Sequence, residues 1–453
     1  MNTTVAEAVA SDAPRGELVG EPLPQTIRRV AIPAVIANLL MTAFQNVDTF
    51  WISRSLGPEA LAAVTGSIFW VWLLISLGEM VSIGLDAVAS RRHGERRPEE
   101  AARTIGDGLL LAALLGGAIA LATPFVLNSL FQALHTGTTV SDIGKHYLGT
   151  YLLGMPLLFG FFAVDAAFRA RGDTRTPLLI LAATTILGII LDPVLIRGSG
   201  PIPALGVSGA ALATLVPRGL ACVVGIAILK KREMVIWLRP RLHVIAAITR
   251  IGAPAAATGI TFSAIYVALT RITTQFGTPA LAALGLGFRL ESVVYVVSVG
   301  TGAALAAIVG QSLGAGDTER AERAGWISAA AVSALGLAMA IVAFFYATPI
   351  VSIFSTDPEV VSEAAAYLRI AAFSQLFLGS EVVLESAMGG AGWTLVPMLF
   401  STAVTASRLP LGAWAASHWG TNGLWWVLSL TAAMRGIVMA LLWASGRWKL
   451  KQI

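Results

Sequence analysis

The chain has 453 residues, of which 56% are hydrophobic and only 13% are charged. A typical soluble domain carries about 25% charged residues, so this composition excludes a soluble globular enzyme and a disordered chain. The single cysteine, Cys222, excludes a disulfide framework and a four-thiolate metal site, and the five histidines are scattered. The net charge is +5, and nearly all the basic residues lie in short loops between apolar segments. This distribution is typical of membrane topology rather than of nucleic-acid binding.

Apolar segments long enough to cross a bilayer recur along the whole chain. A spanning helix needs roughly 20 mostly apolar residues, and by this criterion the sequence predicts twelve transmembrane helices joined mostly by short loops. The residues before them lack the apolar core of a signal peptide, so we expect a disordered cytoplasmic tail over 1–26. The predicted spans are 30–54, 63–90, 104–130, 143–168, 177–197, 205–229, 246–276, 280–312, 324–346, 361–388, 394–417 and 421–445.

Basic residues are distributed unequally between the two sides of these spans. The side that carries both chain termini receives 22 of the 31 Lys and Arg residues, whereas the opposite side has only Arg54, Lys145 and Arg197, with Arg271 near a helix end. Because Lys and Arg accumulate in cytoplasmic loops, we predict a multi-pass protein of the cytoplasmic (inner) membrane. Both termini are then cytoplasmic, including a C-terminal tail over 447–453.

The sequence also repeats itself at a shift of 220 positions. Residues 56–63 resemble residues 276–283, and the same register aligns Gly172 with Gly392. Six helices lie between the copies, and an even number returns the chain to the same side of the membrane. The halves are therefore predicted to be parallel repeats, related by an axis along the membrane normal.

These observations predict an all-α integral membrane fold with two pseudo-symmetric six-helix lobes around a central cleft. The lobes cover 27–230 and 246–446, and a cytoplasmic linker over 231–245 joins them. Two lobes that face each other across a cavity are typical of a transporter. A duplicated scaffold without a transport pathway is the alternative.

The first predicted helix carries polar side chains along one face. Pro33 removes a backbone hydrogen bond and permits a bend. Asn38, Thr42 and Gln45 follow at helical spacing, with Asp48 beside them. Because lipid would leave such groups unsatisfied, this face is expected to contact protein or water. The substrate or cavity candidates combine residues of this helix with Phe162 and Thr214 of later predicted helices. They are Pro33, Asn38, Met41, Thr42, Gln45, Phe162 and Thr214.

A second acidic residue, Asp192, precedes Pro193 near the outer end of the fifth predicted helix. Asp48 and Asp192 both lie toward the outer face of the first lobe, so they are expected to share a pocket. Two carboxylates in a low-dielectric pocket disfavour joint ionisation, which is the minimum equipment for coupling proton flow to a conformational change. The alternatives are that Asp48 is merely a helix-end residue at the outer interface and that Asp192 belongs to a helix-ending Asp-Pro turn.

The second lobe also contains polar residues within its predicted spans: Arg289, Glu291, Glu381 and Glu385. Arg289 and Glu291 are only two positions apart, so each is expected to face a different neighbour. Glu381 and Glu385 are interpreted as interhelical or cavity-lining groups rather than as coupling sites. No nucleotide-binding, metal-binding or hydrolase motif occurs, so an ion gradient is the expected energy source and no cofactor is expected.

Several motifs in this order resemble the multidrug and toxic compound extrusion (MATE) family over nearly the whole chain. They begin with Pro33, fifteen residues before Asp48-Thr-Phe-Trp, and continue with Arg169-Ala-Arg-Gly-Asp-Thr-Arg-Thr-Pro177. Leu191-Asp-Pro193 and Val309-Gly-Gln-Ser-Leu-Gly-Ala-Gly316 complete the set. Each motif is weak alone in a chain rich in Gly and Ala, but their order and spacing are specific together.

The resemblance implies a V-shaped twelve-helix exporter driven by a proton or sodium gradient. The pattern is most similar to the DinF-like branch, in which the acids matching Asp48 and Asp192 are the coupling residues. Relatives often carry Asn four residues before the second acid, where this chain has Gly188, and this difference favours protons over sodium. The other branch has an acid in its seventh helix that this chain lacks, so Glu381 and Glu385 have no such partner.

The sequence therefore predicts a secondary active multidrug exporter, not an enzyme, that exchanges protons for amphipathic, often cationic small molecules. Sodium is the less favoured coupling ion, and one chain is expected to suffice as a monomer within membrane lipid. A dedicated exporter or flippase of one secreted or lipid-linked metabolite is the alternative. A non-transporting membrane scaffold or receptor is a further alternative, since it would share the helices without needing the two acids.

Overall fold

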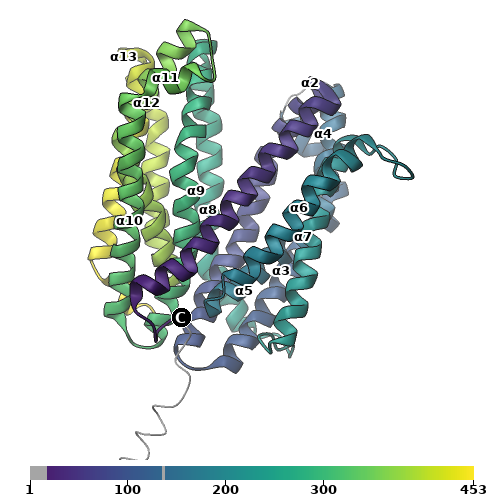
Figure 1. The fold of residues 1–453 in the computed structure, drawn as a ribbon, viewed down its shortest axis with the longest axis vertical. Helices are drawn as coiled ribbons and strands as arrows, with labels where there is room; N and C mark the ends of the chain where they lie inside the picture. The colour runs from purple at the N-terminus through teal and green to yellow at the C-terminus, as the bar shows by residue number, and fades with distance from the viewer. Residues whose placement is uncertain (1–17, 135–137, 453) are drawn as a thin grey trace, which may run out of the picture.

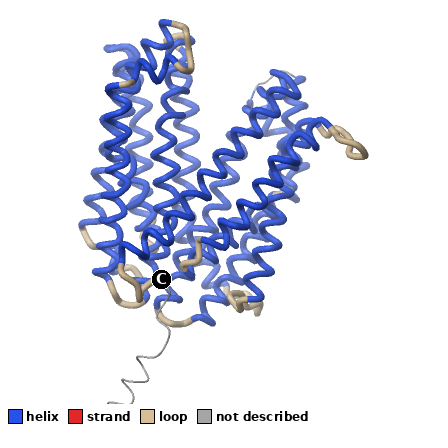
Figure 2. Tube along the Cα trace, in the orientation of Figure 1, coloured by secondary structure: helices blue, strands red, loops and turns tan. Residues whose placement is uncertain are grey.

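A computed structural model describes residues 18–134 and 138–452, and Figure 2 shows helices joined by short loops throughout this part of the chain. The first half of the sequence forms α2 (Leu23–Gly94), α3 (Pro98–Leu134), α4 (Thr138–Leu153), α5 (Met155–Arg171), α6 (Arg175–Arg197) and α7 (Gly206–Lys231). The second half forms α8 (Leu242–Thr274), α9 (Thr278–Gly314), α10 (Thr318–Phe345), α11 (Ala347–Ser352), α12 (Pro358–Gly390), α13 (Leu395–Ala444) and the short 3₁₀ helix η1 (Arg447–Leu450).

The helices form two lobes, one from α2–α7 and the other from α8–α13. In Figure 1 the lobes meet near the end that carries the C-terminus and diverge toward the opposite end. The start of α2 lies beneath the second lobe, and the helix then crosses diagonally into the first lobe. The two-lobed helical architecture predicted from the sequence is thus confirmed.

The described residues contain ten helical segments that are long and apolar enough to span a membrane, or eleven if the bent pair α4–α5 counts as one span. Two of these segments, Leu23–Gly57 and Trp70–Gly94, belong to α2. The 50 residues of α13 would extend for about 75 Å, more than twice the hydrocarbon thickness of a bilayer. Gly420 interrupts α13 with non-helical dihedral angles (φ 62°, ψ −151°), between the predicted spans 394–417 and 421–445. When α4–α5 is counted as one span and α13 is divided at Gly420, the described chain has twelve spans, the predicted number.

The structure differs from the prediction in the fourth span. The sequence predicts one helix over 143–168, but α4 and α5 form a pair bent by 49°. Gly154 lies at the bend and Pro156 stands in the first turn of α5. Proline is tolerated there because the first turn needs no intrahelical N–H donor, while its ring prevents the preceding helix from continuing.

The described parts of both predicted tails differ from the expectation. Residues 1–17 lie outside the described residues, but Leu18 is fully buried and its backbone N–H donates to Oε1 of Gln311 at 3.2 Å. The Nε2 of Gln311 in turn donates to the carbonyl oxygen of Ala170 in the first lobe at 2.7 Å. At the other end, Trp448 is buried and stacks on Trp443 with a ring separation of 3.9 Å. Both terminal segments are thus packed against the helices.

The two halves repeat each other in backbone conformation. Gly57 (φ 80°, ψ −174°) and Gly277 (φ 88°, ψ −179°) are 220 positions apart and share a conformation that requires glycine. Gly172 and Gly392, also 220 apart, both end a helix with positive φ, 91° and 75° respectively. The internal repeat predicted from the sequence is therefore present in the structure.

Each lobe also extends its first helix onto the other lobe. Val30 of α2 belongs to the hydrophobic core of the second lobe, whereas Ile251 of α8 belongs to that of the first. The hydroxyl of Thr174 donates to the carbonyl oxygen of Val30 at 2.9 Å, and that of Thr394 donates to the carbonyl oxygen of Ile251 at 2.8 Å. Each of these two equivalent hydrogen bonds fixes the first helix of a lobe to the start of another helix of the same lobe, on the side where the lobes meet, which we call the interlobe seam.

Glycines allow α2 and α8 to approach closely along this seam. A Cβ atom at Gly84 would lie 2.0 Å from the carbonyl oxygen of Ile248, and one at Gly252 would lie 1.9 Å from that of Met80. The obstructing atoms belong to the backbone, so no side-chain movement would make room. Small residues at helix interfaces allow this packing in membranes, where no hydrophobic effect drives helices together.

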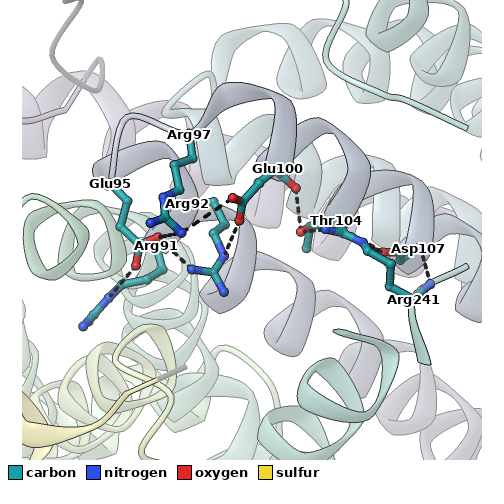
Figure 3. A network of polar contacts seen from close by, with 8 residues as sticks. All are labelled: Arg91, Arg92, Glu95, Arg97, Glu100, Thr104, Asp107 and Arg241. Carbon is teal, nitrogen blue, oxygen red and sulfur yellow. Dashed lines mark hydrogen bonds and ion pairs between the residues drawn. The ribbon is translucent and has the colours of Figure 1, made fainter. Parts of the chain in front are cut away.

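The linker between α7 and α8 is attached to the first lobe by charged groups (Figure 3). Arg241 donates from Nε to Oδ2 of the buried Asp107 at 2.9 Å, and its backbone N–H donates to Oδ1 at 3.3 Å. Nearby, Arg92 binds Glu95 at 2.7 Å and lies 3.6 Å from Glu100. The basic residues counted in the sequence analysis therefore also organise the loops on this side of the molecule.

We predict that Gly84→Ala and Gly252→Ala each destabilise the closed seam, because the added methyl group collides with backbone of the opposite lobe. Overpacking of this kind costs about 1–3 kcal/mol, which thermal unfolding in detergent would detect as a lower midpoint. Gly117→Ala is the matched control, since a Cβ there meets nothing within 4 Å. Equal midpoints for all three variants would contradict the close approach of α2 and α8.

Candidate functional site

The structure brings the two predicted coupling acids together. Asp48 lies on α2 and Asp192 on α6, and their carboxyl groups are within hydrogen-bonding reach of each other. Asp192 is 0% exposed, and Asp48 is half-buried. Among the described residues, both oxygens of Asp192 and Oδ1 of Asp48 are buried without a hydrogen-bond donor. α6 continues through Asp192 and Pro193 to Arg197, so the alternative of a helix-ending Asp-Pro turn is excluded.

The chemistry of this pair follows from the groups that it lacks. Ionised carboxylates can only accept hydrogen bonds, so a bond between Asp48 and Asp192 requires one of them to carry a proton. A buried carboxylate that has neither a cation nor a hydrogen-bond donor is strongly disfavoured. The arrangement therefore suits a pair that holds one proton and releases it only when its surroundings change.

Two tyrosines of α4 lie near the two acids. Tyr147 and Tyr151 are buried, and their rings stack at 6.0 Å. Both are close enough to interact electrostatically with Asp48, and Tyr147 also interacts with Asp192. The sequence analysis did not identify them, although their spacing of four residues places both on one helical face and was the available signal. Their phenol hydroxyls can donate hydrogen bonds, which the two acids lack.

A tightly packed layer lies one helical turn from the acids. Phe44 precedes Asp48 by four residues, and Gly188 precedes Asp192 by four. A Cβ atom at Gly188 would lie 2.8 Å from the ring of the buried Phe44. The ring thus occupies the space that a side chain at position 188 would need, and α2 packs directly against α6 at this level.

The predicted polar face of α2 makes its hydrogen bonds within its own helix. Nδ2 of Asn38 donates to the carbonyl oxygen of Ala34, and the Thr42 hydroxyl donates to that of Asn38, each at 3.0 Å. Gln45 is exposed, whereas Asn38 and Thr42 are half-buried. These residues leave acceptor atoms for a ligand, but in this structure they do not bond to Asp48.

The remaining first-lobe candidates lie at different levels. Pro33 is buried where α2 packs on the second lobe, and α2 stays helical through it, since only Gly57 has non-helical dihedral angles in this helix. Met41 and Phe162 are half-buried and pack against the core of the first lobe. Thr214 is half-buried on α7. The structure therefore does not gather all the predicted cavity residues around the two acids.

The polar residues of the second lobe form ion pairs and hydrogen bonds instead. Glu381 on α12 is buried and forms an ion pair with Arg435 on α13. Glu385 lies one turn further along α12 and interacts with the same guanidinium group. Glu291 accepts a hydrogen bond from the Tyr367 hydroxyl at 3.2 Å. The contacts of Glu381 and Glu385 agree with their interpretation as interhelical groups.

Two arginines of the second lobe behave differently from each other. Arg289 is exposed and is not brought together with Glu291, in agreement with their spacing. Arg408 is buried and donates to Thr431 at 2.8 Å and to the Tyr266 hydroxyl at 2.7 Å. The sequence analysis did not identify these partners, because residues paired across helices leave no signal in local spacing.

A family model described as MatE matches residues 33–194 and 254–414, one segment in each lobe. The chain belongs to the MatE family. This MATE protein is therefore a multi-pass membrane transporter of small molecules and not an enzyme. The two matched segments begin at Pro33 and Pro254, the prolines that fall within one residue of each other in the internal repeat.

Curated relatives match almost the whole chain. An FAD transporter of Shewanella oneidensis is 28% identical over 429 residues, which cover 93% of this chain and 95% of that protein. A probable multidrug resistance protein NorM of Thermotoga maritima is 27% identical over 444 residues, covering 94% and 93% respectively. Both are similar to this MATE protein over more than nine tenths of their own length.

Solved structures share the same fold. The MATE transporter VcmN of Vibrio cholerae in its bent form has a TM-score of 0.85 at 24% identity, covering 94% of this chain and 97% of VcmN. A MOP superfamily transporter from Pyrococcus furiosus has a TM-score of 0.88 at 21% identity, covering 97% and 100%. These likenesses show the two-lobed fold.

Two substitutions distinguish an unpaired buried acid from a paired one. We predict that Asp192→Asn retains or increases thermal stability in detergent, because its amide supplies a hydrogen-bond donor to Asp48. Glu381→Gln should lower stability by up to about 3–5 kcal/mol, since it removes the ion-pair partner of the buried Arg435 and leaves only the more distant charge of Glu385. A marked loss of stability in Asp192→Asn would mean that the carboxylate has a stabilising partner, and this would contradict the geometry described above.

Proposed function

We propose that this MATE protein is a secondary active exporter that exchanges protons for amphipathic, often cationic small molecules. The observation that supports it most is the Asp48–Asp192 pair, in which Asp192 is fully buried and both of its oxygens, with Oδ1 of Asp48, lack a donor among the described residues. Ionisable groups within spanning segments are costly and are usually retained for function. A pair that takes up and releases one proton is a coupling device for an ion gradient.

The transport cycle follows from the topology. With both termini in the cytoplasm of a cell bounded by the cytoplasmic membrane, the end at which the lobes diverge in Figure 1 faces outside. The structure then represents an outward-open state. Protons from outside reach Asp48 and Asp192, lower the affinity for the bound compound and release it. The interlobe seam must open for the next compound to enter from the cytoplasm.

Protons are favoured over sodium by the packing around the acids. A sodium ion needs several oxygen ligands, and Gly188 provides none at the position where relatives often carry Asn. The Phe44 ring also fills the space beside Gly188, within 2.8 Å of a Cβ position there. Because a proton needs only one acceptor, the Asp48–Asp192 pair is sufficient for it.

Each chain contains both lobes, so we propose that a monomer in membrane lipid carries out the whole cycle without a bound cofactor. A dedicated exporter is the second candidate function, because the FAD transporter of Shewanella oneidensis is similar over 93% of this chain. In that case the same two acids would drive export of one metabolite rather than of many cations. Transport of FAD alone would favour this alternative.

The proposed function is tested in everted vesicles that contain the full-length protein. An acidic interior should drive uptake of the fluorescent cation rhodamine 6G, whereas a sodium gradient at constant pH should not. Asp48→Asn and Asp192→Asn should reduce proton-driven uptake to the level of vesicles without the protein. In each variant the new amide donates to the remaining carboxylate, so the pair no longer takes up and releases a proton. Asp142→Asn is the matched control, since Asp142 is 71% exposed and pairs with Lys145 at 3.3 Å.

Several results would contradict the proposal. Undiminished proton-driven uptake in Asp48→Asn and Asp192→Asn would exclude these acids as the coupling pair. Uptake driven only by sodium would exclude proton coupling. A parallel measurement with FAD in place of rhodamine 6G separates the multidrug exporter from the dedicated one.

A further inference from the structure

Two of the sequence motifs lie away from the acid pair and contact each other at the end where the lobes meet (Figure 1). Ala170 of the motif 169–177 lies at the end of α5, and Gln311 of the motif 309–316 lies near the end of α9. Gln311 is fully buried, and its Nε2 donates to the carbonyl oxygen of Ala170 at 2.7 Å. Carbonyl groups in the last turn of a helix have no intrahelical donor, so the Gln311 amide satisfies one of them. This hydrogen bond joins the first lobe to the second.

The segment before α2 is attached to the second lobe at the same place. The backbone N–H of Leu18 donates to Oε1 of Gln311 at 3.2 Å, and its carbonyl oxygen accepts from Nη2 of Arg320 in α10 at 2.7 Å. Arg320 also donates to the hydroxyl of the buried Thr26 at 3.1 Å. Both backbone polar groups of Leu18 are therefore bonded to side chains of the second lobe.

The side chain of Leu18 lies against the first lobe. Leu18 is fully buried, and a Cβ atom at Gly172 would lie 2.6 Å from its Cδ2. Gly172 ends α5 with a φ of 91°, a conformation that favours glycine, and the missing side chain leaves room for the leucine. Leu18 also packs within the hydrophobic core of the second lobe. It is thus held by one lobe through its backbone and contacts the other through its side chain.

The internal repeat shows that the fold itself does not require these contacts. At the shift of 220 positions, Leu18 corresponds to Leu238 and Gln311 corresponds to Arg91. Leu238 lies in the linker before α8, as Leu18 lies before α2, but it is 61% exposed. The first helix of the second half therefore forms without a buried leucine at this position. The buried Leu18 and its glutamine partner are specific to one side of the seam.

We propose that Leu18, Gln311 and the turn over 170–172 form a latch that holds the interlobe seam closed. Gln311 is a positioning residue, because it binds Ala170 across the seam and places Leu18 against Gly172. Separation of the lobes at this end breaks the Gln311–Ala170 hydrogen bond and withdraws the leucine from the first lobe. The backbone bonds of Leu18 lie within the second lobe and persist. The latch thus sets the ratio of open to closed seam.

The role of this latch in transport rests on the proposed function, in which the seam opens once in each cycle. Its contacts do not include Asp48 or Asp192. Seam opening is therefore measured without an ion gradient and without a transported compound. Failure of the latch can then be distinguished from failure of proton coupling, which the vesicle experiment tests separately.

The test measures how fast a maleimide modifies a thiol that is buried beside the latch. Ser90 of α2 is fully buried and packs on Gly310 of α9, where an added Cβ atom would lie 1.9 Å from its Oγ. The reporter is Ser90→Cys with Cys222→Ala in the full-length protein in detergent. A second protein keeps Ser90 and the native Cys222, which is buried in the core of the first lobe and reports general unfolding. When reclosing is faster than modification, the rate follows the population of the open state.

Leu18→Ala should increase the modification rate of the Ser90→Cys thiol about tenfold or more, because it removes most of the buried side chain. The rate at Cys222 should not change. Gln311→Met removes the hydrogen bond between the lobes and should act in the same direction, whereas Leu18→Met nearly conserves volume and should keep modification slow. Leu238→Ala is the matched control, since Leu238 is exposed at the equivalent position of the repeat.

Three results would overturn the proposal. An unchanged rate at the Ser90→Cys thiol in Leu18→Ala would show that the leucine does not hold the seam. An equal acceleration at Cys222 would reduce the effect to a general loss of stability. A Ser90→Cys thiol that stays unmodified with and without Leu18→Ala would contradict a latch, because a latch requires a seam that opens.

Discussion

The central constraint on this molecule is that a bilayer offers no partner to a buried carboxylate. Most acids within the spanning helices meet this constraint inside the protein, as Glu381 does with Arg435 and Asp86 does with Arg169 at 3.5 Å. Within the described part of the chain, Asp192 is the carboxyl group with both oxygens buried and without a donor. In the proposed mechanism, a proton shared with Asp48 satisfies Asp192, so that protonation acts on the packing of α2 against α6.

The helix that carries Asp48 connects the acid pair to the interlobe seam. At its start α2 packs in the core of the second lobe through Val30, and near Asp48 it packs on α6 through Phe44 and Gly188. The seam itself has little tolerance for change, because Gly84 and Gly252 place backbone against backbone. A change in the packing of α2 against α6 therefore acts on a helix that belongs to both lobes, which provides a physical route from protonation to the opening of the seam.

Local sequence signals predicted the fold well. The internal repeat predicted the shared backbone of Gly57 and Gly277, and Gly420 marked the division of α13. The bend between α4 and α5 was missed because the apolar run continues through Gly154. The two acids of the site were found because charge within an apolar span is a local signal. Tyr147 and Phe44, which lie near these acids, were not found, and neither was the ion pair between Glu381 and Arg435 in the second lobe. These contacts depend on how distant helices pack.

The central claim is that Asp48 and Asp192 hold a proton that competes with the transported compound. The most direct measurement is the proton count released when rhodamine 6G binds to purified protein in weakly buffered detergent solution, followed with a pH indicator. We predict release of about one proton per bound cation for the wild type near neutral pH, because two adjacent carboxylates share one proton. Asp192→Asn should release none while still binding the dye. Binding to the wild type without proton release, or undiminished release from Asp192→Asn, would contradict the claim.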